Sequence, residues 1–436
     1  MKPKPQSALQ KSSSILIPCP HPGQFLLWRG RNRFNVVRCG RRWGKTAFAI
    51  FLIASGVFGQ LTGTPVPVSY MAPSYKMMVT VWDSVTVMLA PAIRKTDTQN
   101  RRIWLANGQW IDFWSLQDPS RVRGQKYGLM IVDEAALVDG LDGIWQQVLR
   151  PTLTDFSGHA WFLSTPIEGT GFEVLDGFSA RFGNWRSFQA PTHGNPFLSR
   201  AELAEIESQM PDDFFRQEYL AEYVSFAGKN FFQYFSPAKH TGVAGTPPNT
   251  LFLSWDFNIS NTCLVIDGKP GHVAVLREYL GEILDLEGIC RQVRMDYPGI
   301  RFTINGDASG NAGSAVSSGN VSAYEIIRSA LNIRWEDFNV PASNPSHLNS
   351  YLQCNTFLRR HSLKINPQCE NLLNDMRKVK VIREGRKLTI DKSKADLTHY
   401  SDPLRYHLFA EHQYLFDRLH LSDAEVLQEA ELDHSI

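Results

Sequence analysis

The stretch Arg38-Cys39-Gly40-Arg41-Arg42-Trp43-Gly44-Lys45-Thr46 decides the fold of the first half of this chain. Its last seven residues read G-x-x-x-G-K-T, one residue shorter than the usual phosphate-binding loop. In such a loop, backbone N–H groups at a helix N-terminus bind phosphate, the lysine neutralises the β/γ oxygens and the hydroxyl binds Mg²⁺. We therefore predict that residues 40–46 hold a nucleoside triphosphate, with Lys45 on the phosphates and Thr46 on the metal.

The segments on either side of the loop have the pattern that this interpretation needs. Residues 34–37 (FNVV) predict a short strand that leads into the loop, and residues 46–60 predict a helix that is apolar on nearly all sides and hence buried. Short Gly/Lys motifs also occur by accident, and the alternative is a glycine-basic turn before a core helix. A second motif has to decide between the two.

That second motif is the run Leu129-Met130-Ile131-Val132-Asp133-Glu134. Four apolar residues that end in two acids are typical of a buried parallel strand whose carboxylates emerge at the edge where the phosphate loop lies. Asp133 would hold Mg²⁺, directly or through water, and Glu134 would polarise the attacking water. A lone acid pair would indicate only a solvated helix start, but together with the loop it predicts an ATPase.

The chain is long enough for two domains. At 436 residues it exceeds what one hydrophobic core usually serves, and its 43% hydrophobic and 20% charged composition is that of an ordinary soluble protein. We expect neither a signal peptide nor a membrane span, and the six cysteines show no metal-binding spacing. The predicted domains are a P-loop ATPase domain at 1–195, a helical linker subdomain and hinge at 196–245, a second α/β domain at 246–412 and an acidic tail at 413–436.

Charge is distributed unevenly along the chain, although the net charge is only +2. No Asp or Glu occurs before Asp83, whereas the tail from Glu411 carries seven acids against the single Arg418. This uneven charge indicates that the N-terminal part binds an anionic ligand and that the acidic tail contacts a protein. A tail that is simply solvated would explain the acids equally well.

The second half carries three acids in a pattern of its own. Asp256 lies in the strand-like residues 251–258, Asp307 ends the short strand of residues 302–306, and Asp402 lies at a predicted helix start. Residues 262–267 and 272–280 read as an antiparallel meander between them. Two strands and a helix that each present an acid have the layout of an RNase H-like nuclease, in which carboxylates hold two divalent ions that activate water. Each acid alone would more often be a cap, so the prediction depends on all three.

Basic residues crowd the segment 377–394, which alternates apolar and basic positions around a Glu384-Gly385 turn. A basic β-hairpin beside a metal-carboxylate site would bind a DNA backbone without reading its sequence, although an ordinary solvated hairpin has the same pattern. The basic residues are Arg377, Lys378, Lys380, Arg383, Arg386, Lys387, Lys392 and Lys394.

With its short arginine-bearing loop, acid-ending strand and downstream acid trio, the chain resembles the large terminase subunit of tailed bacteriophages over residues 21–409. The fold this implies is a P-loop (RecA/ASCE-like) parallel-sheet ATPase domain followed by an RNase H-like α/β nuclease domain. His21-Pro22-Gly23-Gln24 looks like the family's adenine-binding motif, and residues 71–75 look like its strand-loop after the P-loop helix. Ser164-Thr165-Pro166 looks like its γ-phosphate-sensing coupling motif.

The resemblance also implies roles for single residues. Arg41 stands where the family places its P-loop arginine, and Arg123 resembles the position of an arginine finger inserted from a neighbouring subunit, although a salt bridge within its own subunit is an equal alternative. Glu278 is a weaker candidate for a fourth metal-site carboxylate. The predicted catalytic residues are Glu134, Arg41, Arg123, Asp256, Asp307 and Asp402. The predicted nucleotide-binding residues are Gln24, Gly40, Arg41, Arg42, Trp43, Gly44, Lys45, Thr46, Asp133 and Thr165. The predicted metal ligands are Thr46 and Asp133 in the ATPase site and Asp256, Asp307 and Asp402 in the nuclease site.

Activity, cofactors and partners follow from the resemblance as expectations. The chain would hydrolyse ATP with Mg²⁺ to move double-stranded DNA into a procapsid, and would cut concatemeric DNA with two divalent ions, Mg²⁺ or Mn²⁺. It would act in the host cytoplasm as a ring of five subunits that binds transiently to the portal protein of the procapsid. A small terminase subunit would be its partner. We expect no membrane contact, and we do not expect the chain in the mature virion. The alternatives are a P-loop helicase-nuclease of DNA repair or recombination, and a structural DNA clamp without enzymatic activity.

Overall fold

The computed structural model describes residues 15, 17–243, 245, 248–257, 261–280, 285–311, 321–384, 387–391 and 397–415. It divides into two compact units. Unit 1 comprises residues 1–203 and 212–225, and unit 2 comprises residues 204–211 and 226–436. The residues predicted as a linker subdomain, 196–245, are therefore divided between the two units.

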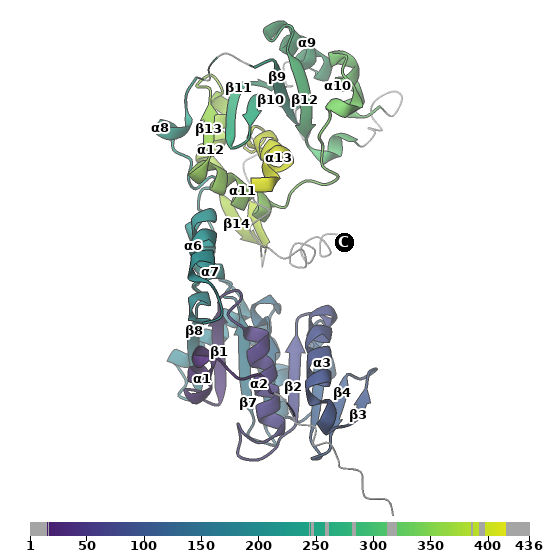
Figure 1. Ribbon diagram of the computed structural model, residues 1–436, viewed down its shortest axis with the longest axis vertical. Coiled ribbons are helices and arrows are strands. Elements are labelled where there is room, and N and C mark those ends of the chain that lie inside the picture. The colour runs from purple at the N-terminus through teal and green to yellow at the C-terminus, as the bar shows by residue number, and fades with distance from the viewer. Residues whose placement is uncertain are drawn as a thin grey trace, which may run out of the picture. The chain divides into compact units, whose positions relative to one another are not determined.

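Unit 1 is built on an eight-stranded sheet in the order β3-β4-β5-β2-β6-β7-β1-β8 (Figure 1). All neighbouring strands from β5 to β8 in this order are parallel, whereas β3 and β4 form an antiparallel edge. The strands are β1 Phe34–Cys39, β2 Val68–Ala72, β3 Ile93–Asp97, β4 Arg102–Leu105, β5 Trp110–Ser115, β6 Leu129–Asp133, β7 His159–Ser164 and β8 Trp185–Ala190. The helices are α1 Pro22–Arg29, α2 Lys45–Val57, α3 Tyr75–Leu89, α4 Leu141–Ile144, α5 Gly171–Gly177 and α7 Asp212–Glu218, and α6 Arg200–Gln209 crosses from unit 1 into unit 2.

The central strands are apolar along their whole length because both faces of the sheet are covered. In β6, Leu129 and Ile131 pack into one core with α2 and α3, and Met130 and Val132 pack into the core on the other face. Figure 1 shows α2 and α3 side by side on the first of these faces. Strands buried on both faces lose the usual alternation of apolar and polar residues, and the run of four apolar residues in the sequence has this cause.

Unit 2 contains a five-stranded sheet in the order β12-β9-β10-β11-β13 and a separate two-stranded hairpin. Strands β9, β10 and β11 form the predicted antiparallel meander, and β12 pairs in parallel with β9. The strands are β9 Thr250–Asp256, β10 Thr262–Lys269, β11 His272–Leu280, β12 Arg301–Gly306, β13 Ser362–Ile365, β14 Val381–Glu384 and β15 Lys387–Ile390. The helices are α8 Pro237–His240, α9 Leu286–Asp296, α10 Ala323–Leu331, α11 His347–Arg360, α12 Glu370–Lys378 and α13 Ser401–His412.

The two faces of this second sheet carry different helices. Leu251, Leu253 and Trp255 of β9 pack into one core with α9 and α10, which lie next to β9 and β12 in Figure 1. Helix α13 packs against β9, β10 and β12, with Phe252 of β9 in contact with His407 of α13. The sheet therefore holds α13, with its Asp402, close to the strands that carry Asp256 and precede Asp307.

The region predicted as a helical linker subdomain contains short helices. Helix α7 ends at Glu218, and Ala221 adopts a positive φ of 57° that no helix continues through. Helix α8 ends at His240, and Thr241 then forms a β-bridge with Ile365 of unit 2. Among the described residues, no helix is long and apolar enough to cross a bilayer.

Candidate functional site

The loop that follows β1 has glycine where no side chain fits. A Cβ on Gly40 would lie 2.5 Å from the Tyr219 carbonyl oxygen and still closer to the hydroxyl of Thr192. Gly44 has a φ of 102°, a conformation that L-residues rarely adopt, and it immediately precedes α2. The predicted G-x-x-x-G-K-T loop is therefore a strand-to-helix turn that directs backbone N–H groups of the first turn of α2 outward.

Lys45 joins three of the predicted motifs at one point. Its Nζ lies 2.7 Å from Oε1 of Glu134, which follows β6, and donates a hydrogen bond of 3.2 Å to Oγ1 of Thr165, which follows β7. Burial is the largest single influence and disfavours the charged amine, but the neighbouring groups, Glu134 foremost, together outweigh it, and the pKa of Lys45 is raised. The sequence predicted all three residues, and the structure places them together.

Asp133 lies beneath this contact at the end of β6 and is only 4% exposed. It accepts hydrogen bonds from the hydroxyl of Tyr70 at 2.9 Å and from the backbone N–H of Glu134 at 3.0 Å. Burial, and then the charge of Glu134, raise the pKa of Asp133 to about 6. Two acids against one lysine leave negative charge that a divalent cation would neutralise, and Thr46 is exposed at the start of α2. The residues present therefore fit Mg²⁺ together with a triphosphate.

Gln24 lies beside the loop, but both ends of its side-chain amide already bind the protein. Its Oε1 accepts from the His21 backbone N–H at 3.1 Å, and its Nε2 donates to the Gly44 carbonyl at 3.0 Å. The predicted adenine contact would have to be made with the remaining amide hydrogen or after rearrangement. Trp43 is buried against His21 and Phe48, so this residue can offer a nucleotide only its backbone.

The two loop arginines have different environments. Arg41 forms a salt bridge with Glu218 of α7, with 2.5 Å between Nε and Oε2, and its backbone N–H also donates to the Glu218 carbonyl. Arg42 is exposed and has a positive φ of 60°, and Asn195 donates to its carbonyl at 2.8 Å. The sequence missed this contribution of residues 192–219 to the loop, because no local pattern relates Glu218 to Arg41.

Arg123 follows a short 3₁₀ turn at residues 119–122 and precedes the positive-φ residue Gly124. Its side chain is exposed. An exposed guanidinium on this turn is accessible to a second subunit, so both roles foreseen for Arg123 remain predictions.

In unit 2, Asp256 and Asp307 lie at the carboxyl ends of neighbouring parallel strands. Gly306 pairs with Trp255, and the Asp307 N–H donates to the Trp255 carbonyl at 2.9 Å. Gly306 has a φ of 142°, and a Cβ there would lie 2.6 Å from the Trp255 nitrogen, so only glycine allows the strands to approach this closely. Both acids are buried, with exposures of 0% and 2%.

Asp402, at the start of α13, is paired with a cation of its own helix. Its Oδ1 accepts from Nη2 of Arg405 at 2.7 Å and from Nε at 3.1 Å, and both side chains are almost fully buried. Ser254 of β9 donates to the Pro403 carbonyl at 2.7 Å, which fixes this end of α13 against the sheet. The sequence predicted Asp402 but not its partner Arg405.

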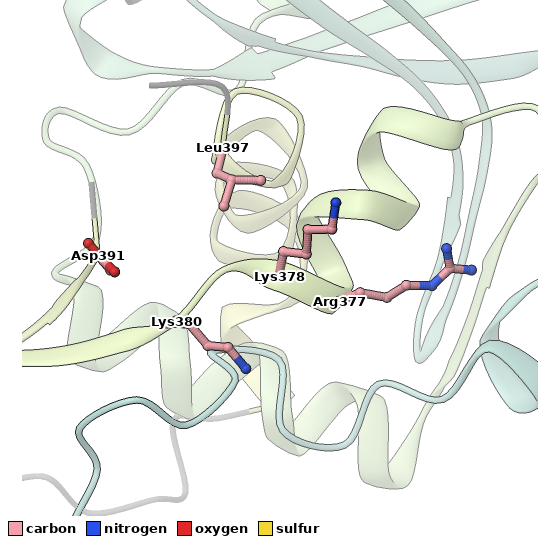
Figure 2. A pocket seen from close by; sticks show the side chains of 5 residues that line it. All are labelled: Arg377, Lys378, Lys380, Asp391 and Leu397. Carbon is pink, nitrogen blue, oxygen red and sulfur yellow. The ribbon is translucent and has the colours of Figure 1, made fainter. Parts of the chain in front are cut away.

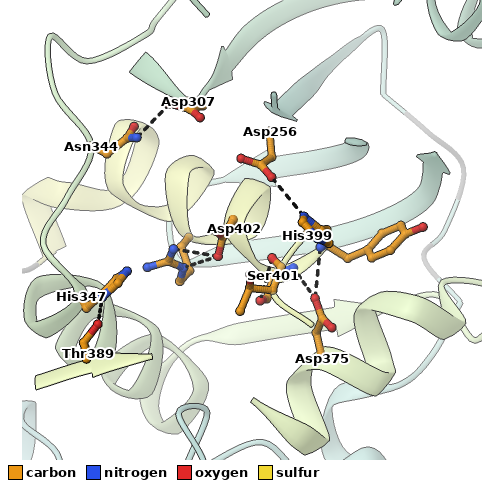
Figure 3. A network of polar contacts seen from close by, with 12 residues as sticks. Asp256, Asp307, Asn344, His347, Asp375, Thr389, His399, Ser401 and Asp402 are labelled. Atoms are coloured by element: carbon orange, nitrogen blue, oxygen red, sulfur yellow. Dashed lines mark hydrogen bonds and ion pairs between the residues drawn. The ribbon is translucent and has the colours of Figure 1, made fainter. Parts of the chain in front are cut away.

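The three acids occupy one region of unit 2 (Figure 3). Burial raises the pKa of Tyr406, and the charges of Asp402, Asp256 and Asp307 raise it further, so all three carboxylates act on the same hydroxyl group. Among the described residues, however, no group of three His, Cys, Asp or Glu side chains is arranged to hold a metal. Asp256 and Asp307 fit a divalent ion at the strand ends, whereas Asp402 would have to exchange Arg405 for the metal.

Polar residues that the sequence analysis missed surround these acids (Figure 3). Nδ1 of His399 lies 3.8 Å from Oδ2 of Asp256, and Asn344 donates to Asp307 at 2.8 Å. Asp375 accepts backbone N–H bonds from Tyr400 and Ser401 at 3.1 and 3.0 Å, and burial raises its pKa to about 6. His399, three residues before Asp402, was the one of these that its spacing could have suggested.

Glu278, the weaker fourth candidate, accepts hydrogen bonds from the backbone N–H groups of Asn371 and Leu372 in the first turn of α12. A carboxylate at a helix N-terminus is stabilised by these donors and by the helix dipole. This contact gives Glu278 a structural role as a cap.

The predicted hairpin is present as β14 and β15, but three of the basic residues assigned to it, Arg377, Lys378 and Lys380, lie before its first strand. Arg377 and Lys378 form the last turn of α12. With Lys380, Asp391 and Leu397 they line a cavity of about 280 Å³ (Figure 2). Arg386, Lys392 and Lys394 lie outside the described residues.

Comparison with known proteins bears on the fold and the family resemblance. No protein-family model matches the chain. The chain is 30% identical over 206 residues to the terminase large subunit of Escherichia phage T5, a match that covers 46% of this chain and 46% of that protein. The large terminase of a thermophilic bacteriophage has a similar structure, with a TM-score of 0.54 and 14% identity over 89% of this chain and 98% of that one.

The predicted resemblance is confirmed. The same thermophilic phage protein in complex with ATP-γ-S matches with a TM-score of 0.52 and 15% identity, over 89% of this chain and 98% of that one. The predicted fold class, a P-loop α/β domain followed by an RNase H-like α/β domain, is confirmed as well. The sequence match spans about half the length of the curated relative.

Proposed function

We propose that this chain acts as a large terminase subunit, an ATP-driven motor that moves double-stranded DNA into a procapsid and cuts it at the start and end of packaging. Unit 1 would be the ATPase and unit 2 the nuclease. The observation that carries the proposal is the meeting of Lys45, Glu134 and Thr165, which come from three separate strand ends, around one glycine loop. The similarity to the proteins of phage T5 and of the thermophilic bacteriophage supports it.

The contacts of Lys45 suggest how nucleotide binding would prepare the site. Lys45 is paired with Glu134, and the oxygens of a triphosphate would compete for the same amine. When the amine turns to phosphate, Glu134 becomes available to orient and polarise water, and Thr165 loses a donor. Bound Mg²⁺ would neutralise phosphate charge. Thr46 and Asp133 would hold it, and Thr165 would then sense the γ-phosphate.

In unit 2, Asp256 and Asp307 would bind divalent ions, either Mg²⁺ or Mn²⁺, which activate water for phosphodiester cleavage. Asp402 would join them once it leaves Arg405, whose guanidinium is then available to a DNA phosphate. The basic residues at the end of α12 and on the hairpin would bind the DNA backbone. The partners proposed from the family are the portal protein and the small terminase subunit. The chain itself would assemble into a ring of five subunits, with Arg123 acting within or between subunits.

Separate substitutions test the two activities. Glu134→Gln should bind ATP but hydrolyse it about 100-fold more slowly or worse, as expected for loss of a general base. The matched control is Glu202→Gln on the exposed side of α6, which should hydrolyse ATP at the normal rate. Normal turnover in Glu134→Gln would remove Glu134 from its proposed role.

Asp256→Asn should abolish plasmid digestion in Mg²⁺ or Mn²⁺ while ATP hydrolysis continues. Asp267→Asn, towards the other end of the neighbouring strand β10, is the control and should digest DNA normally. A chain that hydrolyses ATP and unwinds duplexes would instead indicate the repair helicase-nuclease. A chain without either activity would indicate a DNA clamp.

A further inference from the structure

A second cavity of unit 2 has a strongly basic lining. It has a volume of about 640 Å³ and lies between the β10–β11 turn, the end of α11, the start of β13 and residues 414–415 after α13. Among the described residues that line it, none is Asp or Glu. Its cationic side chains are Lys239, Arg359, Arg360 and Lys364, with His240, His272 and His361 beside them.

This cavity is separate from the three acids. Asp256 pairs with Thr262, the first residue of β10, whereas Pro270 and Gly271 in the cavity wall follow its last residue, Lys269. Strand β10 has 8 residues. At a rise of about 3.4 Å per residue, the cavity and Asp256 lie at opposite ends of the sheet, roughly 25 Å apart. A ligand in the cavity would therefore not contact the proposed metal site.

The positive charges in the lining repel one another. Burial and the charge of Arg359 lower the pKa of Arg360, and burial, Arg360 and His272 lower the pKa of His361. A group whose charged form is disfavoured by neighbours of the same sign is stabilised by an anion placed among them. The cavity is thus complementary to an acidic ligand.

An acidic segment begins where the chain passes the cavity. Tyr414, which is 50% exposed, and Leu415 line the cavity, and the described part of the chain ends at residue 415. The following 21 residues, 416–436, carry a single Lys or Arg, Arg418, and two histidines, against a set of acids. These acids are Asp417, Asp423, Glu425, Glu429, Glu431 and Asp433.

We propose that the acidic segment 417–433 binds in the basic cavity of its own chain. The segment is attached at Leu415, a residue of the cavity wall, so its local concentration there is of the order of millimolar without any further affinity. A free polyanion such as DNA would have to displace a tethered competitor. The segment therefore screens this basic surface from nucleic acid and leaves the basic residues of α12 and the hairpin as the DNA-binding ones.

Zero-length carbodiimide cross-linking of the full-length chain tests this binding, because it joins only a lysine amine and a carboxylate that touch. Mass spectrometry should find Lys239 or Lys364 joined to acids of the segment 417–433. Arg360→Glu, which removes no lysine, should lower the yield about threefold or more, as loss of a partly exposed ion pair would. Arg301→Glu, at the first residue of the opposite edge strand β12, is the matched control and should cross-link normally.

Trypsin provides a second measurement that does not depend on cross-linking. Arg418 is the single Lys or Arg after residue 415, so loss of residues 419–436 reports cleavage at one bond. Cleavage should be slow at low salt, faster at high salt, and about threefold faster in Arg360→Glu, since salt and charge reversal weaken the same attraction. Cleavage that is independent of both salt and Arg360 would overturn the proposal.

Two further outcomes would also overturn it. Cross-links found only between isotope-labelled and unlabelled molecules would make the cavity a contact between copies. An absence of tail cross-links, combined with protection of Lys239 and Lys364 from acetylation by duplex DNA, would make it a DNA-binding surface instead.

Discussion

Each of the two candidate sites contains a cation paired with an acid, and the two pairs differ in their exposure. In unit 1 the side chains of Lys45 and Glu134 are 13% and 27% exposed, whereas in unit 2 those of Arg405 and Asp402 are 3% and 5% exposed. A partly exposed pair can separate at small cost, because water solvates the partners. A buried pair cannot lose one partner without leaving a charge in a poorly solvated place. The first pair is suited to a switch, and the second also maintains the fold.

The largest effect should come from breaking the buried pair. Arg405→Ala leaves Asp402 without its partner and should lower the free energy of unfolding of unit 2 by about 3–5 kcal/mol, measured by urea denaturation. Arg291→Ala, which breaks an exposed pair with Glu287 on α9, should cost at most about 1 kcal/mol. Equal effects of the two substitutions would remove the distinction between the sites.

The next effect concerns the glycine that each site requires. Gly306→Ala in unit 2 and Gly40→Ala in unit 1 each place a Cβ against backbone atoms, and each should destabilise its unit by about 3 kcal/mol. Gly177→Ala, at the end of α5, is the control because a Cβ there meets nothing within 4 Å. Thermal unfolding followed by circular dichroism measures all three, and a harmless Gly306→Ala would contradict the close strand approach beside Asp307.

Nucleotide binding should distinguish the two units. Mg²⁺·ATP at about 100 times its dissociation constant should stabilise unit 1 by about 2.7 kcal/mol and leave unit 2 unchanged. Lys45→Ala should abolish this stabilisation while the nucleotide-free protein changes little, because the Lys45–Glu134 pair is partly exposed. Differential scanning calorimetry with and without ATP provides the measurement, and a shift of the unit 2 transition would argue against separate sites.

The smallest effect is a pH dependence that both units share. The pKa values of Asp133 and Asp375 are each raised from an ordinary value of 3.8 to about 6, by burial in the first place. The folded protein therefore binds more protons than the unfolded chain between about pH 4 and pH 6, so these two groups make stability fall as pH rises through this range. Asp133→Asn should flatten the fall for unit 1 and Asp375→Asn for unit 2.

Urea midpoints at several pH values between 4 and 7 measure this dependence. Asp83→Asn, on the exposed side of α3, is the control and should retain the pH profile of the unsubstituted chain. A profile that is unchanged in both Asp133→Asn and Asp375→Asn would show that other groups control it.

Much of the fold could be predicted because its signals are local. The apolar residues of β6 follow one another in the sequence, and the two glycines of the loop lie within five residues. Backbone geometry requires each of these glycines at its own position. The acid-ending strands were recognised for the same reason. By contrast, Glu218 lies 177 residues from Arg41, and no periodicity links the two. Asp375 caps α13 from another helix, which also leaves no trace in a single sequence.

The sequence by itself determined which residues could carry chemistry: a glycine-lysine loop, an acid-ending strand and three aspartates, each recognisable from its immediate neighbours. The tertiary structure alone decided how those residues are partnered, since it turns Lys45 to Glu134, Arg41 to Glu218 and Asp402 to Arg405. The physical reason is that backbone conformation follows local sequence, whereas the free energy of a charge depends on its burial and on the charges that the fold places within a few ångströms.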